Sequence, residues 1–205
     1  MNDNTLIIYG GAFNPPTIAH VEIIRKLAET YPNNSIYVIP SNDKYITGWK
    51  EQYSPIPFED RIDLLSDAAV AAEKHNVRIS YLGIEQYIIT SGNTIDTVNY
   101  LKDTRYSDVA IVIGYDNLSK IKTWHRGDEL LAENEFIVLT RGKHSDSTNL
   151  RFHFLQLEGF DNISSTQIRD AYLNNDLESI KNYVPINVFE YLKGHKDLFK
   201  ENTNV

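Results

Sequence analysis

The sequence predicts an α/β fold in which a doubly wound, mostly parallel sheet carries helices on both faces and is followed by a small helical C-terminal part. Two observations predict this fold: short apolar runs recur along the chain, and the segments between them space their apolar residues as helices do. Because parallel neighbours need a crossover long enough to hold a helix, the alternation favours a parallel sheet covered on both sides. Ligands of such sheets bind beyond the carboxyl ends of the strands.

The expected strands are apolar runs suited to burial on both faces of a sheet: Thr5–Tyr9, Ser35–Ile39, Val77–Leu82, Val109–Ile113, Glu135–Leu139 and Phe152–Leu157. Helical spacing is clearest in two crossovers, at Ile18, Val21, Ile24, Leu27 and Ala28, and at Ile62, Leu65, Ala68, Ala69 and Ala72. Near the C-terminus, helical patterns cover Thr166–Leu173, Asp176–Asn182 and Ile186–Lys193.

Two polar segments lack this periodicity. Ser41–Pro57 contains Gly48, Pro55 and Pro57 and is expected to be a long loop that could close over a site, and Arg141–Asn149 is a second loop. Neither segment has the composition of a linker. The chain of 205 residues is therefore expected to form one domain, 1–205, with its C-terminal helical part at about 163–205.

Composition excludes several classes of protein. A formal net charge of −8 disfavours sequence-independent binding of nucleic acid, and the lack of cysteine rules out disulfides, thiolate catalysis and cysteine-based metal sites. The apolar runs are too short to span a membrane, and the first residues lack the cationic start of a signal peptide. We therefore expect a cytoplasmic protein with no membrane or nucleic-acid partner. The sequence leaves open whether the protein forms a homo-oligomer.

The segment after the first expected strand is typical of a phosphate site. It reads GGAFNPPTIAH from Gly10 to His20. Paired glycines allow close approach of a ligand, and a helix that begins near Thr17 offers backbone N–H groups and a positive dipole end to an anion. Thr17 and His20 are three residues apart and so share one helix face. The alternative is a tight turn in which Thr17 only caps the helix.

A second segment of this kind lies near the C-terminus and reads NISSTQIR from Asn162 to Arg169. Serine and threonine ahead of a helical run cap the helix, and the guanidinium of Arg169 can reach the same helix end to bind a phosphate. The alternative is a plain helix cap with a solvated arginine.

These two segments resemble the paired signatures of the class I nucleotidylyltransferases. Gly10–His20 is similar to G-G-x-F-D/N-P-x-H/T-x-G-H, with Thr17 in place of the first histidine, Ala19 in place of the glycine, and His20 retained. Asn162–Arg169 contains the match to I-S-S-T-x-I/L-R. Two matching signatures in the expected order are a strong signal, and the resemblance implies a Rossmann-like fold.

Intermediate segments narrow the resemblance to the bacterial nicotinate-nucleotide adenylyltransferases. The segments that look like this family's patterns are Thr94–Thr97, Ile113–Leu118, Trp124–Leu131 and Tyr183–Leu192. The resemblance implies transfer of AMP from ATP to nicotinate mononucleotide, with release of pyrophosphate. Alternatives are a related adenylyltransferase that uses nicotinamide mononucleotide or phosphopantetheine, and a nucleotide-binding regulator without catalysis.

The resemblance also implies a role for each matching residue. The catalytic residues would be His20, Thr17, Lys50 and Arg169. ATP would be bound by Gly10, Gly11, Ala12, Phe13, His20, Gly114, Asp116, Ile163, Ser164, Ser165, Thr166 and Arg169. Nicotinate mononucleotide would be bound by Asn14, Lys50, Thr94, Trp124 and His125. Mg²⁺ would arrive with ATP, and no metal site of the protein's own is expected.

Three of these residues have simpler alternatives. Lys50 could be a solvated loop lysine, with Lys44 nearby. Trp124 could be an ordinary core aromatic, and Asp116 a helix cap or a solvated carboxylate.

Overall fold

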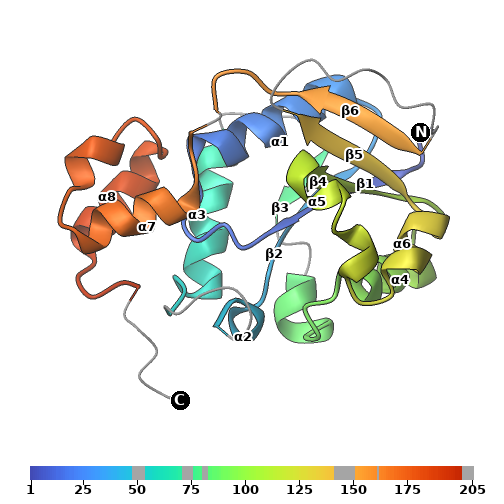
Figure 1. The fold of residues 1–205 in the computed structure, drawn as a ribbon, viewed down its shortest axis with the longest axis horizontal. Helices are drawn as coiled ribbons and strands as arrows, with labels where there is room; N and C mark the ends of the chain where they lie inside the picture. Colours follow the sequence, from blue (N-terminus) through green and yellow to red (C-terminus); the bar gives the residue numbers. More distant parts are fainter. Residues whose placement is uncertain (48–53, 71–75, 80–82, 141–150, 161, 200–205) are drawn as a thin grey trace.

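The computed structural model forms a sheet of six parallel strands in the order β3-β2-β1-β4-β5-β6 (Figure 1). The structure describes residues 1–47, 54–70, 76–79, 83–140, 151–160 and 162–199. The strands are β1 (Leu6–Gly11), β2 (Ile36–Pro40), β3 (Val77–Ile79), β4 (Val109–Gly114), β5 (Glu135–Thr140) and β6 (Phe152–Gln156). The strand order reverses between β1 and β4, which makes the sheet doubly wound and Rossmann-like, as predicted.

Helices cover both faces of the sheet (Figure 1). The longer ones are α1 (Ile18–Thr30), α3 (Phe58–Val70), α4 (Thr94–Thr104), α7 (Ser165–Leu173) and α8 (Ile186–Gly194). Shorter ones are α2 (Asp43–Tyr45), η3 (Ile84–Ile88), α5 (Tyr115–Leu118), η4 (Ile121–Thr123), α6 (Gly127–Glu133) and η5 (Leu177–Ile180). No helix in the described part of the chain is long and apolar enough to cross a lipid bilayer.

Alternation of side chains along the strands builds a core on each face of the sheet. Along β1, Leu6 and Ile8 point into one core and Ile7 and Tyr9 into the other, as the two-residue period of a strand requires. The core that joins α1 and α3 to the sheet includes Ile7, Ile24, Leu27, Val38 and Leu65. The core on the opposite face, under α4 and α6, includes Ile8, Val98, Leu101, Ile111 and Leu130.

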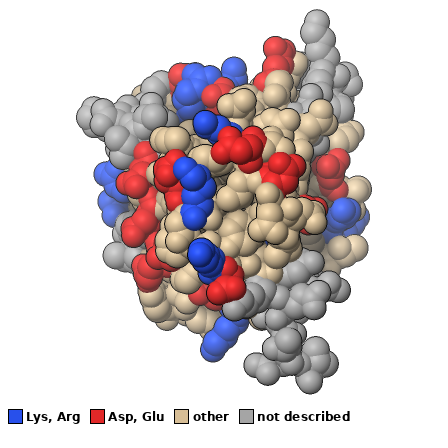
Figure 2. Space-filling view, turned by 90° about the vertical axis from the view of Figure 1, so that its left-hand side faces the viewer, with Lys and Arg blue, Asp and Glu red and all other residues tan. Residues whose placement is uncertain are grey.

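The C-terminal part forms a third core against α3, at the left of Figure 1. Its buried members include Ile56, Leu64, Ile168, Val188 and Phe189. Figure 2 shows the side of the molecule that carries this C-terminal part, and acidic and basic side chains are interspersed among the described residues of that face. This face therefore presents no continuous basic surface among its described residues, the kind of surface that phosphate backbones require.

Two expectations about local structure were wrong. Ser41–Pro57 is not entirely a loop, because Asp43–Tyr45 form α2, which Asn42 caps by accepting a hydrogen bond from the Tyr45 backbone at 2.6 Å. Residues 48–53 of this segment lie outside the described residues, and its closure over the site stays a prediction. The helix expected at Asp176–Asn182 is only the short 3-10 helix η5, which begins after the left-handed Asn175 and the non-helical Asp176 and is followed by turns at 181–183. The expected end of β3 and the loop at Arg141–Asn149 involve 80–82 and 141–149, outside the described residues.

Candidate active site

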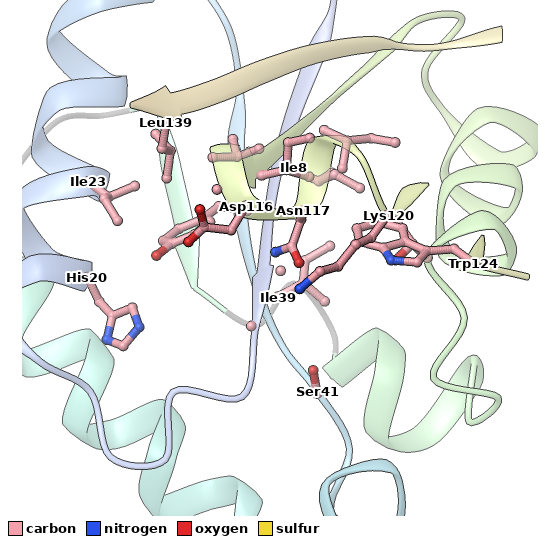
Figure 3. Close-up of a pocket in the computed structure, with 18 of the residues that line it drawn as sticks. Ile8, His20, Ile23, Ile39, Ser41, Asp116, Asn117, Lys120, Trp124 and Leu139 are labelled. Carbon is pink, nitrogen blue, oxygen red and sulfur yellow. The ribbon is translucent and has the colours of Figure 1, made fainter. Parts of the chain in front are cut away.

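A cavity of about 870 Å³ opens at the carboxyl ends of β1 and β4, where the strand order reverses. Its volume falls in the range of about 300–1,000 Å³ that is typical of small-molecule sites. In Figure 3, His20 and Trp124 lie at opposite ends of the cavity, with Asp116 and Asn117 between them. One end therefore meets the start of α1, and the other end has an aromatic wall.

Most predicted site residues gather at this cavity. Those that line it are Gly10, Gly11, Thr17, His20, Thr94, Gly114, Asp116, Trp124, His125 and Ile163. Those that are described but do not line it are Ala12, Phe13, Asn14, Ser164, Ser165, Thr166 and Arg169. Lys50 lies outside the described residues.

The glycine at the end of β1 serves packing as well as ligand approach. A side chain on Gly11 would come within 3.1 Å of the Phe13 ring, which is buried. Phe13 packs edge-on against the imidazole of His20, with 5.0 Å between ring centroids. Gly11 thus makes room for the aromatic ring that supports His20.

A capping box at the start of α1 fixes the orientation of His20. The Thr17 backbone N–H donates to His20 Nδ1 at 3.0 Å, and Thr17 Oγ1 accepts from the His20 backbone N–H at 3.4 Å. Because Nδ1 accepts a hydrogen bond, the neutral ring carries its proton on Nε2. Burial lowers the pKa of His20 to about 4, so near neutral pH the ring is an uncharged hydrogen-bond donor.

The capping box changes the role expected of the helix start. Its backbone N–H groups are not all available to an anion, since Ile18 donates to the Tyr183 carbonyl at 3.0 Å and His20 donates to Thr17. The expectation that the start of α1 offers free backbone N–H groups to an anion was therefore wrong for Ile18 and His20. The positive dipole end of α1 remains directed at the cavity.

The low pKa of His20 predicts how the free energy of unfolding depends on pH. An unfolded chain binds a proton at a histidine near pH 6.5, whereas the folded chain binds it only near pH 4. The contribution of His20 is therefore fully present above about pH 6.5 and is lost as pH falls toward 4, by up to about 3 kcal/mol. Urea unfolding of His20→Gln should show a shallower loss of stability than the parent chain over this window; parallel curves would contradict the assignment.

The two signature segments meet beside the cavity, although about 150 residues separate them. Arg169 is buried and donates from Nη1 to the Asn14 carbonyl at 2.7 Å. Ser165 Oγ donates to the Pro15 carbonyl at 2.8 Å, and Ser164 caps α7 by accepting from the Gln167 backbone. The second signature therefore holds the loop that leads into α1.

This contact bears on the predicted roles of two residues. Arg169 also donates to Thr166 Oγ1 at 3.3 Å, so its guanidinium already contacts protein oxygens. Asn14 is fully buried, and its Oδ1 accepts from the Ile56 backbone N–H at 2.9 Å. Direct contact of Arg169 with phosphate, and of Asn14 with the acceptor, stay predictions.

The opposite side of the cavity carries the remaining predicted residues. Gly114 is the last residue of β4, Asp116 lies in α5, and Thr94 begins α4. Trp124 is half-buried and ends η4, while His125 is exposed. An aromatic face beside hydroxyl and backbone donors suits an aromatic ring that bears an anionic group.

Sequence reasoning uses Arg61 only as the arginine of the family's F-x-x-R pattern, eleven positions after Lys50, and assigns it no role. Arg61 is fully buried and donates to the carbonyl groups of Ala12, Ser41 and Ile56 at 2.6, 2.8 and 2.9 Å. It also pairs with Asp43 at 2.6 Å. Arg61 therefore ties together the segments that follow β1 and β2. No local pattern in the sequence marks these partners, because each comes from a different segment.

Two lining residues were also missed. Glu85 is buried and accepts a hydrogen bond from Thr97 Oγ1 at 3.2 Å. Lys120 lies on the turn between α5 and η4. Neither residue belongs to a motif, so only the fold reveals that they face the cavity.

Comparisons with known proteins point to the family that the two signatures suggest. The cytidylyltransferase-like family model matches residues 8–171. A "Probable nicotinate-nucleotide adenylyltransferase" of Acholeplasma laidlawii is 29% identical over 202 residues, covering 96% of this chain and 98% of that protein. One of the same name from Sulfurimonas denitrificans is 30% identical over 167 residues, covering 82% and 85%.

Solved structures share the fold. Plasmodium falciparum nicotinic acid mononucleotide adenylyltransferase, complexed with NaAD, superposes with a TM-score of 0.74 at 22% identity, covering 93% of this chain and 95% of that one. The fold, the meeting of the two signatures and the family match agree: the chain belongs to the cytidylyltransferase-like family and, within it, to the nicotinate-nucleotide adenylyltransferases.

Proposed function

We propose that this protein transfers the adenylyl group of ATP to nicotinate mononucleotide, giving the dinucleotide deamido-NAD and pyrophosphate in NAD biosynthesis. The observation that carries the proposal is the contact of Arg169 with Asn14, which brings both nucleotidylyltransferase signatures to one cavity. The names of the relatives support the choice of acceptor.

The chemistry needs positioning more than a strong base. A phosphate oxygen of the mononucleotide attacks the α-phosphorus of ATP, a new P–O bond forms, and the bond to the bridging oxygen of pyrophosphate breaks. The nucleophile is already an anion, so no proton has to be removed. The protein must offset the repulsion of two anions and the charge that grows on the leaving group.

Residues at the α1 end of the cavity suit this task. The Nε2–H of His20 can donate to a phosphate oxygen of ATP, because the capping box fixes the ring with Nδ1 turned to Thr17. The positive end of α1 adds a fixed partial charge. Thr17 is 1% exposed and therefore acts as a positioning residue for the ring.

Mg²⁺ would arrive as part of the substrate Mg·ATP. The described residues include no group of three or more metal-binding side chains, so the triphosphate would supply the oxygens that hold the ion. Such an ion neutralises charge on the leaving pyrophosphate.

At the other end of the cavity, Trp124 would stack on the pyridine ring. The hydroxyl of Thr94 and the backbone N–H group of His125 would donate to its carboxylate, whereas the Trp124 N–H already donates to the Ile121 carbonyl at 2.9 Å. Donors of this kind favour a carboxylate over a carboxamide, whose NH₂ needs an acceptor.

Pyrophosphate release tests the proposal. Mg·ATP is supplied with nicotinate mononucleotide, nicotinamide mononucleotide or phosphopantetheine, and the three values of kcat/KM are compared. The proposal expects the first to be highest. A preference for either of the other acceptors would overturn the choice of substrate, and ATP binding without turnover on any of them would identify a regulator.

Replacement of Arg169 by alanine is expected to weaken ATP binding and turnover together, with kcat/KM for ATP falling about tenfold or more, since a charge-assisted hydrogen bond to the Asn14 carbonyl is lost. Steady-state kinetics with varied Mg·ATP measure both constants. Unchanged KM and kcat in a variant of normal thermal stability would remove Arg169 from the site.

A further inference from the structure

Among the described residues that line the cavity, acidic side chains outnumber lysines and arginines, although both proposed substrates are anions. The described lining residues include the carboxylates of Asp116 and Glu85. His20 is uncharged near neutral pH, and the guanidinium of Arg169 points to the Asn14 carbonyl. Among the lining residues that the structure describes, Lys120 alone is a lysine or arginine.

The backbone of Lys120 is held in place by its own turn. Its N–H donates to the Asn117 carbonyl at 2.9 Å, and its carbonyl accepts from Thr123 N and Oγ1 at 2.8 and 2.7 Å. The next residue, Ile121, is fully buried. Gly127 packs so closely on this turn that a side chain there would lie 1.9 Å from the Ile121 carbonyl oxygen. The ammonium group therefore extends from a fixed base.

The side chain of Lys120 points into the cavity. In the view of Figure 3, its ammonium lies between the imidazole of His20 and the indole of Trp124. A mononucleotide with its ring on Trp124 must extend its phosphate toward the His20 end to meet the α-phosphorus of ATP. The Lys120 ammonium would then lie on the side from which that phosphate extends.

We propose that Lys120 binds the phosphate group of the acceptor mononucleotide, an inference that rests on the proposed function. A lysine ammonium suits this task because it is a compact charge with three donors on a flexible stem, and a charge-assisted hydrogen bond to phosphate is strong. Its positive charge offsets the repulsion between the incoming phosphate and the triphosphate, and also the repulsion that the Asp116 carboxylate exerts on either anion.

Calorimetric binding of two ligands to the full chain tests the proposal. Nicotinate mononucleotide carries the phosphate, and nicotinate riboside keeps the ring and carboxylate but lacks it. With Lys120→Met, the Kd of the mononucleotide is expected to rise roughly tenfold, while the Kd of the riboside stays unchanged. Lys120→Arg, which keeps the charge, should restore most of the affinity.

Lys122→Met is the matched control, because Lys122 is exposed on the same turn but does not line the cavity. It should leave both Kd values unchanged. Equal weakening of both ligands by Lys120→Met would assign Lys120 to the ring or its carboxylate and overturn the proposal, and so would unchanged binding of the mononucleotide. Failure of the proposed function is distinguishable, because it would show in the unmodified chain as a lack of turnover with nicotinate mononucleotide.

Discussion

Replacement of His20 by alanine is expected to lower kcat about 100-fold or more, the loss typical of removing one preorganised donor from a developing charge. The reason is geometric: Thr17 fixes the ring with its Nε2–H available to the cavity, so the donor needs no reorganisation during the reaction. Steady-state release of pyrophosphate from Mg·ATP and nicotinate mononucleotide measures the effect.

His153→Ala is the control for this loss. His153 lies on β6, where it pairs with Glu135, and it does not line the cavity. Its turnover should match that of the parent chain. Because burial lowers the pKa of His20 to about 4, kcat/KM should also show no titration of this residue between about pH 8 and about pH 5.5. Near-normal turnover of His20→Ala would remove the residue from the catalytic role.

Replacement of Arg61 by methionine is expected to lower the free energy of unfolding by about 3 kcal/mol or more, because three carbonyl groups lose their donor at a cost of about 1–3 kcal/mol for each one left buried and unsatisfied. Methionine preserves most of the apolar stem, but the carbonyl groups of Ala12, Ser41 and Ile56 lose a buried donor and Asp43 loses its pair. Such a loss is a large share of the total stability of about 5–15 kcal/mol that domains have.

Urea unfolding measures this effect as a lower midpoint with an unchanged slope. Arg25→Met is the matched control, because Arg25 pairs with Glu22 and Glu29 on the exposed side of α1. Surface pairs contribute little, so its midpoint should stay at the parent value. If Arg61→Met also unfolds at the parent midpoint, Arg61 does not hold the loops together.

The sequence predicts the parts of this molecule that depend on local patterns. The strand at Leu6–Gly11 and the helix at Ile18–Thr30 follow from buried apolar runs and helical spacing, and the cavity lies at the reversal of strand order that alternation implies. The resemblance to the nicotinate-nucleotide adenylyltransferases assigns His20 and Trp124 to one site, and both residues line the cavity.

Contacts between distant segments could not be predicted in this way. Arg61 donates to carbonyl groups in the segments after β1 and after β2, and the Tyr183 carbonyl that accepts from the Ile18 N–H is far away in the chain. The expectation that Arg169 is either a phosphate ligand or solvated did not include a third outcome, a bond to the Asn14 carbonyl. Each depends on tertiary geometry that a motif does not encode.

The bonds from α7 to the first loop have a consequence for biosynthesis of the protein. All strands of the sheet are encoded before residue 157, but the loop ahead of His20 is held by Ser165 and Arg169, and the start of α1 by the Tyr183 carbonyl. A nascent chain whose last helices are still inside the ribosome lacks these bonds. The loop and the helix start that orient His20 can therefore be held in place only when translation is nearly complete.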